Sequence, residues 1–192
     1  GQILDFCQSR GVGVAQYGHA SVGLIHVRPI LNLKSAEDIE HMKCISEESF
    51  RLVRQYGGSL CGEHGDGLVR SAYIERFFGK ELYQGFRKIK DAFDPENRMN
   101  PGKIVDPHPI DEDLRYGIDY KVPEFMTEFK MVNDGSFTAA VEMCSGVGTC
   151  RQALHKTMCP SFRATMNLGM SHWTGVQNFI IQDFAPPGLA PR

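Results

Sequence analysis

Short apolar runs at the start of the chain predict a helix followed by β-strands. Residues Gln2–Arg10 have a helical pattern that ends at Gly11. The runs Val12–Tyr17 and Leu24–Ile30 are β-like, and the second is rich in β-branched residues and ends beside a proline. Ser59–Cys61 is predicted to form a further short strand.

Residues Ser35–Tyr56 carry a clear helix signature. Ser35 is of the N-cap type, and Asp38 follows it as a shorter carboxylate variant of the capping box. The pair Gly57-Gly58 ends the pattern. Between these limits, the residues of one predicted face recur at helical spacing: Ile39, Met42, Ile45, Ser46, Phe50 and Val53.

A second helix is predicted at about Glu81–Phe93, and it stops at Asp94-Pro95. Its apolar residues fall on one face: Leu82, Phe86, Ile89 and Phe93. Strand-like runs, a long helix, another strand and a helix together indicate an α+β fold, in which a sheet carries helices on one face.

From Asp106 the pattern changes. The stretch DPHPIDEDLRYGIDYKVPEF is rich in proline and aspartate and lacks sustained periodicity, so it is predicted to be a linker or extended arm. A group of cysteines follows, and the end of the chain, Leu168–Arg192, has no convincing pattern.

Composition and charge narrow the class of protein. The chain has 192 residues, 42% hydrophobic and 23% charged, as in soluble globular proteins. Its 21 Lys and Arg residues against 23 Asp and Glu residues give no basic field, so no nucleic acid is expected as a partner. No apolar run approaches the roughly 20 residues of a membrane span, so we expect no transmembrane segment.

The first residues, GQILDFCQSRGVGV, contain neither an initiator Met nor a signal-peptide layout. We therefore expect a piece of a longer protein. Its expected location is the cytoplasm, with peripheral attachment to the inner membrane left open.

Histidine and glutamate side chains suggest a metal site. His19 and His26 are seven residues apart, a spacing that puts them on opposite faces of a continuous strand. A turn at Ser21–Gly23 would return the chain and bring both imidazoles to one side. Glu63 and His64 follow in the glycine-rich stretch CGEHGDG. Two imidazoles and a carboxylate suit Zn²⁺ or Mn²⁺, and ordinary exposed or hydrogen-bonded side chains are the alternative.

Three segments in order, YGHASVGLIHVRP, GEHGDGLVRS and AFDPENRMNPGKIV, resemble the C-terminal part of the FAD-linked oxidases. The resemblance covers about Gly1–Val105 and points to dehydrogenases of D-2-hydroxy acids such as D-lactate, glycolate and D-2-hydroxyglutarate. It implies an antiparallel sheet with helices on one face, as in the C-terminal part of the family's cap. It also implies a divalent metal bound by His19, His26 and Glu63, with His64 beside the substrate.

These residue types suit the chemistry of a hydroxy acid. A metal on the substrate lowers the pKa of the hydroxyl group, and His64 could take its proton while hydride leaves C2 for the flavin. Arg28 or Arg70 could bind the carboxylate, with a solvated surface charge as the alternative for each. The resemblance places Asn100 and Lys103 on the flavin side, and a plain helix-stop turn is the alternative there.

Two features differ from the resemblance. Many relatives have GDGN where this chain has SVGL at Ser21–Leu24, so the contacts to substrate stay open. Versions with HVRP belong to the subgroup fused to iron–sulfur domains. The chain also lacks pyrophosphate-binding loops, since Gly11-Val12-Gly13 is too short a signal. FAD is therefore expected to be bound mostly by an upstream domain.

The later cysteines resemble a ferredoxin-type motif, C-x2-C-x2-C-x3-C-P. Cys144 and Cys150 occupy the places of its first and third ligands, and Cys159 precedes Pro160 after a longer loop. A [4Fe–4S] cluster needs four thiolates, so the missing ligand would come from a downstream iron–sulfur domain. Reduced structural thiols, or a site that binds Zn²⁺ adventitiously, are the alternatives.

The predicted organisation has four parts. Residues 1–105 are the C-terminal part of an FAD-linked oxidase, 106–138 a linker, 139–167 the start of an iron–sulfur domain, a partial ferredoxin-like helical segment, and 168–192 an unmatched tail from a frameshift or a disordered end. The predicted function is oxidation of a D-2-hydroxy acid by hydride transfer to FAD, with electrons passed to an iron–sulfur cluster. The rivals are a non-catalytic metal-binding accessory module and an inactive truncation product.

Overall fold

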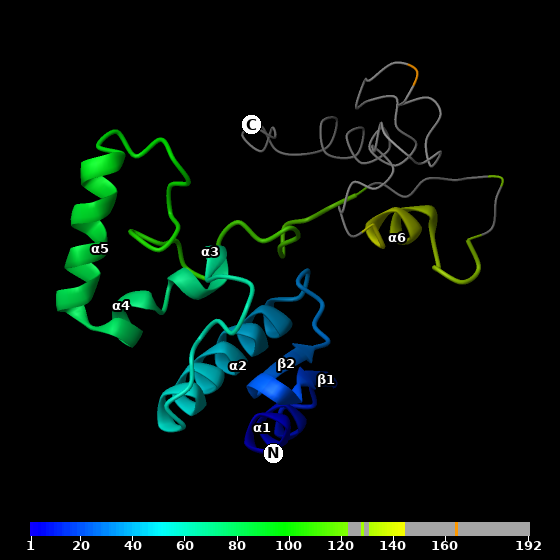
Figure 1. Ribbon diagram of the computed structural model, residues 1–192. Coiled ribbons are helices and arrows are strands. Elements are labelled where there is room, and N and C mark those ends of the chain that lie inside the picture. The colour runs from blue at the N-terminus through cyan, green and yellow to red at the C-terminus, as the bar shows by residue number, and fades with distance from the viewer. Residues whose placement is uncertain (123–127, 129–130, 145–163, 165–192) are drawn as a thin grey trace. The chain divides into compact units, whose positions relative to one another are not determined.

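The structure is a computed structural model, and the residues that it describes are 1–122, 128, 131–144 and 164. The chain divides into two compact units, Gly1–Tyr120 and Lys121–Arg192. The first contains both strands and helices α1–α5, and the second contains helix α6 (Phe137–Glu142) (Figure 1). Among the described residues, none of the helices has the length and apolar character needed to cross a bilayer.

An antiparallel hairpin follows helix α1 (Gln2–Ser9). Its strands are β1 (Val14–His19) and β2 (Leu24–Pro29), and a 3₁₀ turn, η1 (Ala20–Val22), joins them. Gly23 ends that turn with a φ of 68°, a conformation that glycine adopts without steric cost. This small sheet with its helices confirms the predicted α+β fold, and the turn between the two histidines lies where it was expected.

A small hydrophobic core lies beneath the hairpin. Its buried members are Cys7, Val12 and Ile45, from α1, the following turn and α2. Partly buried side chains surround them: Ile3, Phe6, Val14 and Leu31. Burial raises the pKa of the Cys7 thiol, which therefore stays protonated as part of the core.

Helix α2 (Ala36–Gln55) is close to its predicted limits. The Ser35 side chain accepts a hydrogen bond from the N–H of Asp38, which confirms the predicted N-cap. The second half of the capping box differs from the prediction, because the Asp38 carboxylate accepts from the N–H of Asn32, at 2.7 Å, and not from that of Ser35. The carboxylate therefore orders the turn before the helix.

The predicted strand at Ser59–Cys61 is wrong. This segment is part of an irregular connection between α2 and helix α3 (Gly67–Ser71). The Ser59 hydroxyl donates to the Cys61 carbonyl at 2.9 Å, a local side-chain hydrogen bond that competes with strand pairing. The apolar run was too short to distinguish a strand from such a loop.

Helix α3 and helix α4 (Ile74–Phe78) are short elements that the sequence pattern missed. Ile74 is buried, and the ring of Tyr73 stacks on that of Phe50 in α2. The Ser71 hydroxyl donates to Gly67 within α3 and accepts from the N–H of a residue far along the chain, Ile104. These contacts join the short helices to α2 and to the chain that follows α5.

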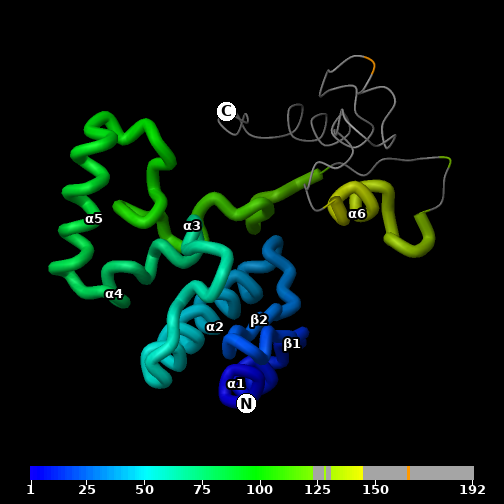
Figure 2. Tube along the Cα trace, viewed as in Figure 1, coloured from blue at the N-terminus to red at the C-terminus, as the bar shows by residue number. Residues whose placement is uncertain are grey.

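Helix α5 (Lys80–Phe93) confirms the second predicted helix, and most of its predicted apolar face is exposed. Leu82, Ile89 and Phe93 are exposed, whereas Tyr83 is the buried residue of the helix. Periodicity identified the apolar face correctly but could not show whether this chain covers it. Figure 2 shows α4 beside α5, and the chain after α5 returning toward α3.

Asp94 organises the turn after α5. Its carboxylate accepts hydrogen bonds from the Lys90 ammonium group and from the N–H groups of Arg98 and Met99, both at 2.8 Å. The Lys90 ammonium group, followed by these backbone donors, lowers the pKa of Asp94 from 3.8 to about 2. The turn predicted as a simple helix stop is thus held by a buried carboxylate.

Candidate metal centre

The register of the hairpin brings His19 and His26 to one face. His19 pairs with Leu24, and Tyr17 pairs with His26. Residues directly opposite each other in a ladder share a face, as do residues two apart in one strand. All four side chains therefore lie on the same side. A spacing of seven residues would put the two histidines on opposite faces of a single strand. Across this hairpin, the same spacing puts them on one face.

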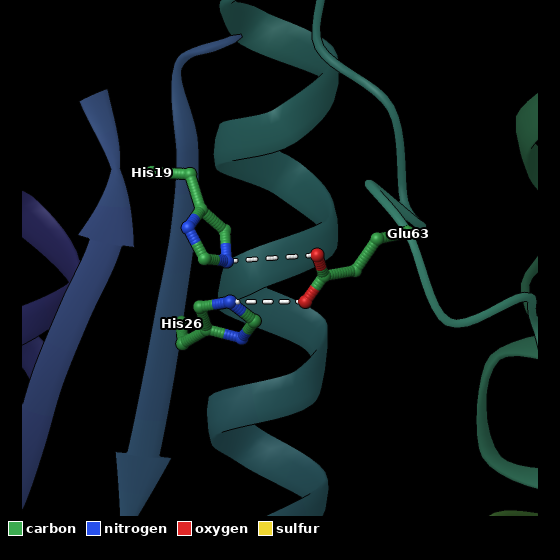
Figure 3. Close-up of side chains that lie close together, drawn as sticks. All are labelled: His19, His26 and Glu63. Atoms are coloured by element: carbon green, nitrogen blue, oxygen red, sulfur yellow. Dashed lines mark ion pairs between the residues drawn. The ribbon is translucent and has the colours of Figure 1, made fainter. Parts of the chain in front are cut away.

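Glu63 approaches this face from the connection between α2 and α3. Its carboxylate oxygens lie 3.1 Å from Nε2 of His26 and 3.6 Å from Nε2 of His19. Figure 3 shows both imidazoles turned toward the carboxylate, which comes from a different segment of the chain. The structure therefore brings the three predicted ligands together.

Glycines allow this approach. A Cβ on Gly62 would lie 1.9 Å from Cδ1 of Leu24, on the face of the hairpin that carries the histidines. Gly65 and Gly67 have φ values of 78° and 58°, which favour glycine on backbone grounds. The loop can therefore lie against the hairpin at Gly62 and turn sharply after Glu63 and His64.

The donor set fits a divalent cation. One ligand atom from each of His19, His26 and Glu63 lies within 4.8 Å of the others. Nε2 of His26 is buried and makes no hydrogen bond, although the Glu63 carboxylate is only 3.1 Å away. A buried ring nitrogen without a hydrogen bond, beside a carboxylate and a second imidazole, matches the nitrogen and oxygen ligands that Zn²⁺ takes in proteins.

His64 lies beside the cluster without belonging to the set of three. Its Nε2 is 2.8 Å from the Glu63 carboxylate, and its side chain is 68% exposed, against 15% for His26. Its ring centroid is 5.9 Å from that of His26. It is therefore an accessible imidazole next to the candidate metal position.

The two predicted substrate arginines have different surroundings. Arg28 follows His26 by two residues in β2, which puts it on the same face of the strand, and it is exposed. Arg28 makes no hydrogen bond or ion pair with the described residues. The Arg70 guanidinium donates to the Gly65 carbonyl at 3.1 Å, so it braces the loop that carries Glu63.

The remaining predicted residues lie elsewhere. The Lys103 ammonium group donates to the Asn100 side chain at 3.3 Å, within the turn that follows Asp94. Cys144 is half-buried just after α6, and Cys150 and Cys159 lie outside the described residues.

Sequence reasoning missed one residue of the site. The ring of Tyr17 stacks on that of His26, with centroids 4.4 Å apart and planes 22° apart. The hairpin register was the signal that could have found it, because it places position 17 directly opposite position 26.

Two other features lie away from this centre. His108, Glu112 and Asp113 also have ligand atoms within 4.8 Å of one another, but His108 already contacts Glu112 at 3.1 Å on the surface. A surface hollow of about 920 Å³ includes residues of α1 and α2 but none of the three ligands. Neither feature has the buried, unbonded nitrogen that marks the hairpin site.

The sequence matches one family of flavoproteins. The model of the FAD linked oxidases, C-terminal domain, matches residues 2–104, and the chain belongs to this family. This confirms the resemblance stated from the sequence motifs.

The chain is also similar to particular curated proteins. It is 38% identical to the D-2-hydroxyglutarate dehydrogenase of Escherichia coli (strain K12) over 166 residues, which is 86% of this chain and 16% of that protein. It is 41% identical to the protein of the same name in Haemophilus influenzae over 160 residues, 79% of this chain and 15% of that one. The glycolate oxidase subunit GlcD of Bacillus subtilis is 30% identical over 102 residues, 53% of this chain and 22% of that subunit.

The chain thus spans about a sixth of the length of the D-2-hydroxyglutarate dehydrogenases that it matches. No solved structure matches it.

Proposed function

We propose that this chain supplies the metal-binding and proton-accepting part of a flavin-dependent enzyme that oxidises a D-2-hydroxy acid. The observation that carries the proposal is the buried Nε2 of His26, which faces the Glu63 carboxylate and forms no hydrogen bond. Leaving a buried polar atom without a hydrogen bond costs about 1–3 kcal/mol, and the nearby carboxylate and second imidazole favour a site that a cation completes. Membership of the FAD-linked oxidase family supports the same conclusion.

The roles of the side chains follow from their positions. His19, His26 and Glu63 would hold Zn²⁺ or Mn²⁺, which lowers the pKa of a substrate hydroxyl bound to it. His64 accepts the hydroxyl proton, because it is an exposed imidazole beside this position. FAD, which would be held mostly by another part of the parent protein, would supply the acceptor for the hydride of C2, so that the substrate becomes a 2-oxo acid.

The two arginines take separate roles in this proposal. Arg28 binds a substrate carboxylate, since it shares the face of β2 with His26 and forms no ion pair among the described residues. Arg70 positions the Glu63 loop through its hydrogen bond to Gly65, and this contact leaves it less free to bind substrate. Asn100 and Lys103 would lie on the flavin side.

The comparisons favour D-2-hydroxyglutarate as the first substrate to test. The matches to D-2-hydroxyglutarate dehydrogenases cover up to 86% of the chain, so they extend beyond residues 2–104, whereas the match to the glycolate oxidase subunit covers 53%. The resemblance of the later cysteines to a ferredoxin-type motif supports electron transfer to an iron–sulfur cluster. Cys144, Cys150 and Cys159 would be ligands, completed by a downstream domain. The parent protein can be assayed with a dye as electron acceptor. We expect it to reduce the dye faster when D-2-hydroxyglutarate is the substrate than when D-lactate is.

Metal content tests the site directly. The purified chain is incubated with Zn²⁺ or Mn²⁺, desalted and analysed by mass spectrometry of the metal. We expect roughly one bound ion in the wild type and a large loss in Glu63→Gln, because the variant lacks the anionic ligand. Asp66→Asn is the matched control, since it removes a carboxylate from the same loop outside the set of three. Equal metal content in wild type and Glu63→Gln would refute the proposed site.

A separate experiment tests the iron–sulfur ligands. Anaerobic reconstitution of the parent protein should produce visible absorption of an iron–sulfur cluster, and serine at position 159 (Cys159→Ser) should reduce it. Unchanged absorption in this variant would exclude Cys159 as a ligand. A parent protein that binds metal but oxidises no hydroxy acid would favour the accessory-module alternative.

A further inference from the structure

We propose that Tyr17 is a positioning residue for the metal centre, holding the imidazole of His26 in the orientation that a cation requires. The inference rests on the proposed metal site and adds a residue to it. Tyr17 is not expected to bind the metal or the substrate. The aromatic ring of Tyr17, and not its hydroxyl group, holds the imidazole in place.

The geometry of the hairpin places the two rings together. Tyr17 lies directly opposite His26 in the ladder, and their rings stack with centroids 4.4 Å apart and an interplanar angle of 22°. The other aromatic contacts of His26 are edge-on, with His19 at 5.3 Å and His64 at 5.9 Å. Tyr17 therefore covers one flat side of the His26 imidazole, while the edge of the imidazole remains directed at Glu63.

His26 needs such a support because its buried Nε2 forms no hydrogen bond, and none is found for its Nδ1 within the described part of the chain. A metal-binding histidine usually donates its second ring N–H to a carboxylate or a carbonyl group, which fixes the ring. Rotation about χ2 of histidine is otherwise weakly restricted. Stacking against Tyr17 restricts this rotation in place of the usual hydrogen bond.

The tyrosine hydroxyl has no part in this role. Tyr17 is about half-exposed, at 52%, and its hydroxyl forms no hydrogen bond with the described residues. Phenylalanine should therefore replace it, whereas an aliphatic residue should not. A purely structural contribution to the hairpin would instead affect unfolding without a specific effect on metal affinity.

The test measures Co²⁺ affinity of the full chain by competition with a chelator, and the absorption spectrum of bound Co²⁺ reports the ligand set. Tyr17→Phe should keep the affinity within a factor of about two, and Tyr17→Leu should weaken it about three- to tenfold, the range expected for an aromatic pair. Gln16→Leu is the control, because position 16 faces the opposite side of the strand. Thermal unfolding of the metal-free variants shows whether each is folded.

Three results would overturn the inference: wild-type affinity in Tyr17→Leu, an equal loss in Gln16→Leu, or a loss in Tyr17→Phe. A loss of affinity in Tyr17→Phe would overturn the inference even if Tyr17→Leu fails to fold. Wild-type chain that takes up no Co²⁺ would instead refute the metal site itself, and the inference with it.

Discussion

Replacing Gly62 by alanine tests how closely the Glu63 loop lies against the hairpin. The new Cβ would be 1.9 Å from Cδ1 and 3.3 Å from Cγ of Leu24. Carbon atoms in contact are about 3.5–4.0 Å apart, so roughly 1.5–2 Å must be gained. Gly62 does not have a positive φ, so its backbone accepts alanine and the effect is steric. Either Leu24 turns toward its neighbours or the loop moves away.

We expect Gly62→Ala to lower the free energy of unfolding by about 1–3 kcal/mol, the usual cost of overpacking. It should also weaken metal binding, because any movement of the loop carries Glu63 away from the two imidazoles. Leu24→Ala removes both of the clashing atoms. The double variant should therefore lose less stability than the sum of the two single variants. Urea unfolding and competition for Co²⁺ measure the two effects.

Gly65→Ala is the matched control. A Cβ there meets no atom within 4 Å, but the φ of 78° is unfavourable for alanine. It should cost about 1–2 kcal/mol through the backbone alone, and Leu24→Ala should not offset this loss. If the effects of Gly62→Ala and Leu24→Ala add within about 0.5 kcal/mol, the close approach of loop and hairpin is refuted.

Three further predictions concern the fold. Ile74→Ala should cost about 2–4 kcal/mol in urea unfolding, because Ile74 is 2% exposed, whereas Ile89→Ala, at 61% exposed, should cost under about 0.5 kcal/mol; similar losses would contradict the assigned burial. Because the pKa of Asp94 is lowered, the stability that its carboxylate contributes is complete above about pH 4 and is lost as the pH falls toward 2. In thermal scans, Asp94→Asn should therefore be less stable than the wild type at neutral pH. Between about pH 4 and 2 it should lose less further stability than the wild type does. Parallel pH curves would exclude this role. Ser35→Ala should lower stability by about 1 kcal/mol through loss of the N-cap, and an unchanged melting temperature would show that the cap contributes little.

Local chemistry explains which elements could be predicted from the sequence. Helix α2 begins after Ser35 because the Ser35 side chain accepts a hydrogen bond from the N–H of Asp38, three residues later. This contact is local, so it does not depend on where the helix lies in the protein. The turn between the histidines likewise depends on Gly23 and its φ of 68°. The three candidate metal ligands were predictable as residue types, since imidazole and carboxylate groups near glycines are visible in the sequence.

Contacts that a pattern of apolar and polar residues does not encode explain what the sequence did not reveal. The short run Ser59–Cys61 forms a loop because its own hydroxyl–carbonyl bond replaces strand pairing. The carboxylate of Asp94 gathers donors from both sides of a turn, which a helix-stop pattern does not indicate. The apolar stripe on α5, including Ile89, is present in the sequence, but its exposure depends on which other parts of the protein pack against it.

By itself, the sequence determined where helices α1, α2 and α5 and the hairpin form and which side chains could bind a metal, because capping, turn formation and side-chain chemistry act over a few residues. Only the tertiary structure decided that Glu63 meets two imidazoles, that Tyr17 stacks on one of them and that a ring nitrogen is left buried without a hydrogen bond. These relations depend on strand register and on the close approach of distant segments, which no local pattern specifies.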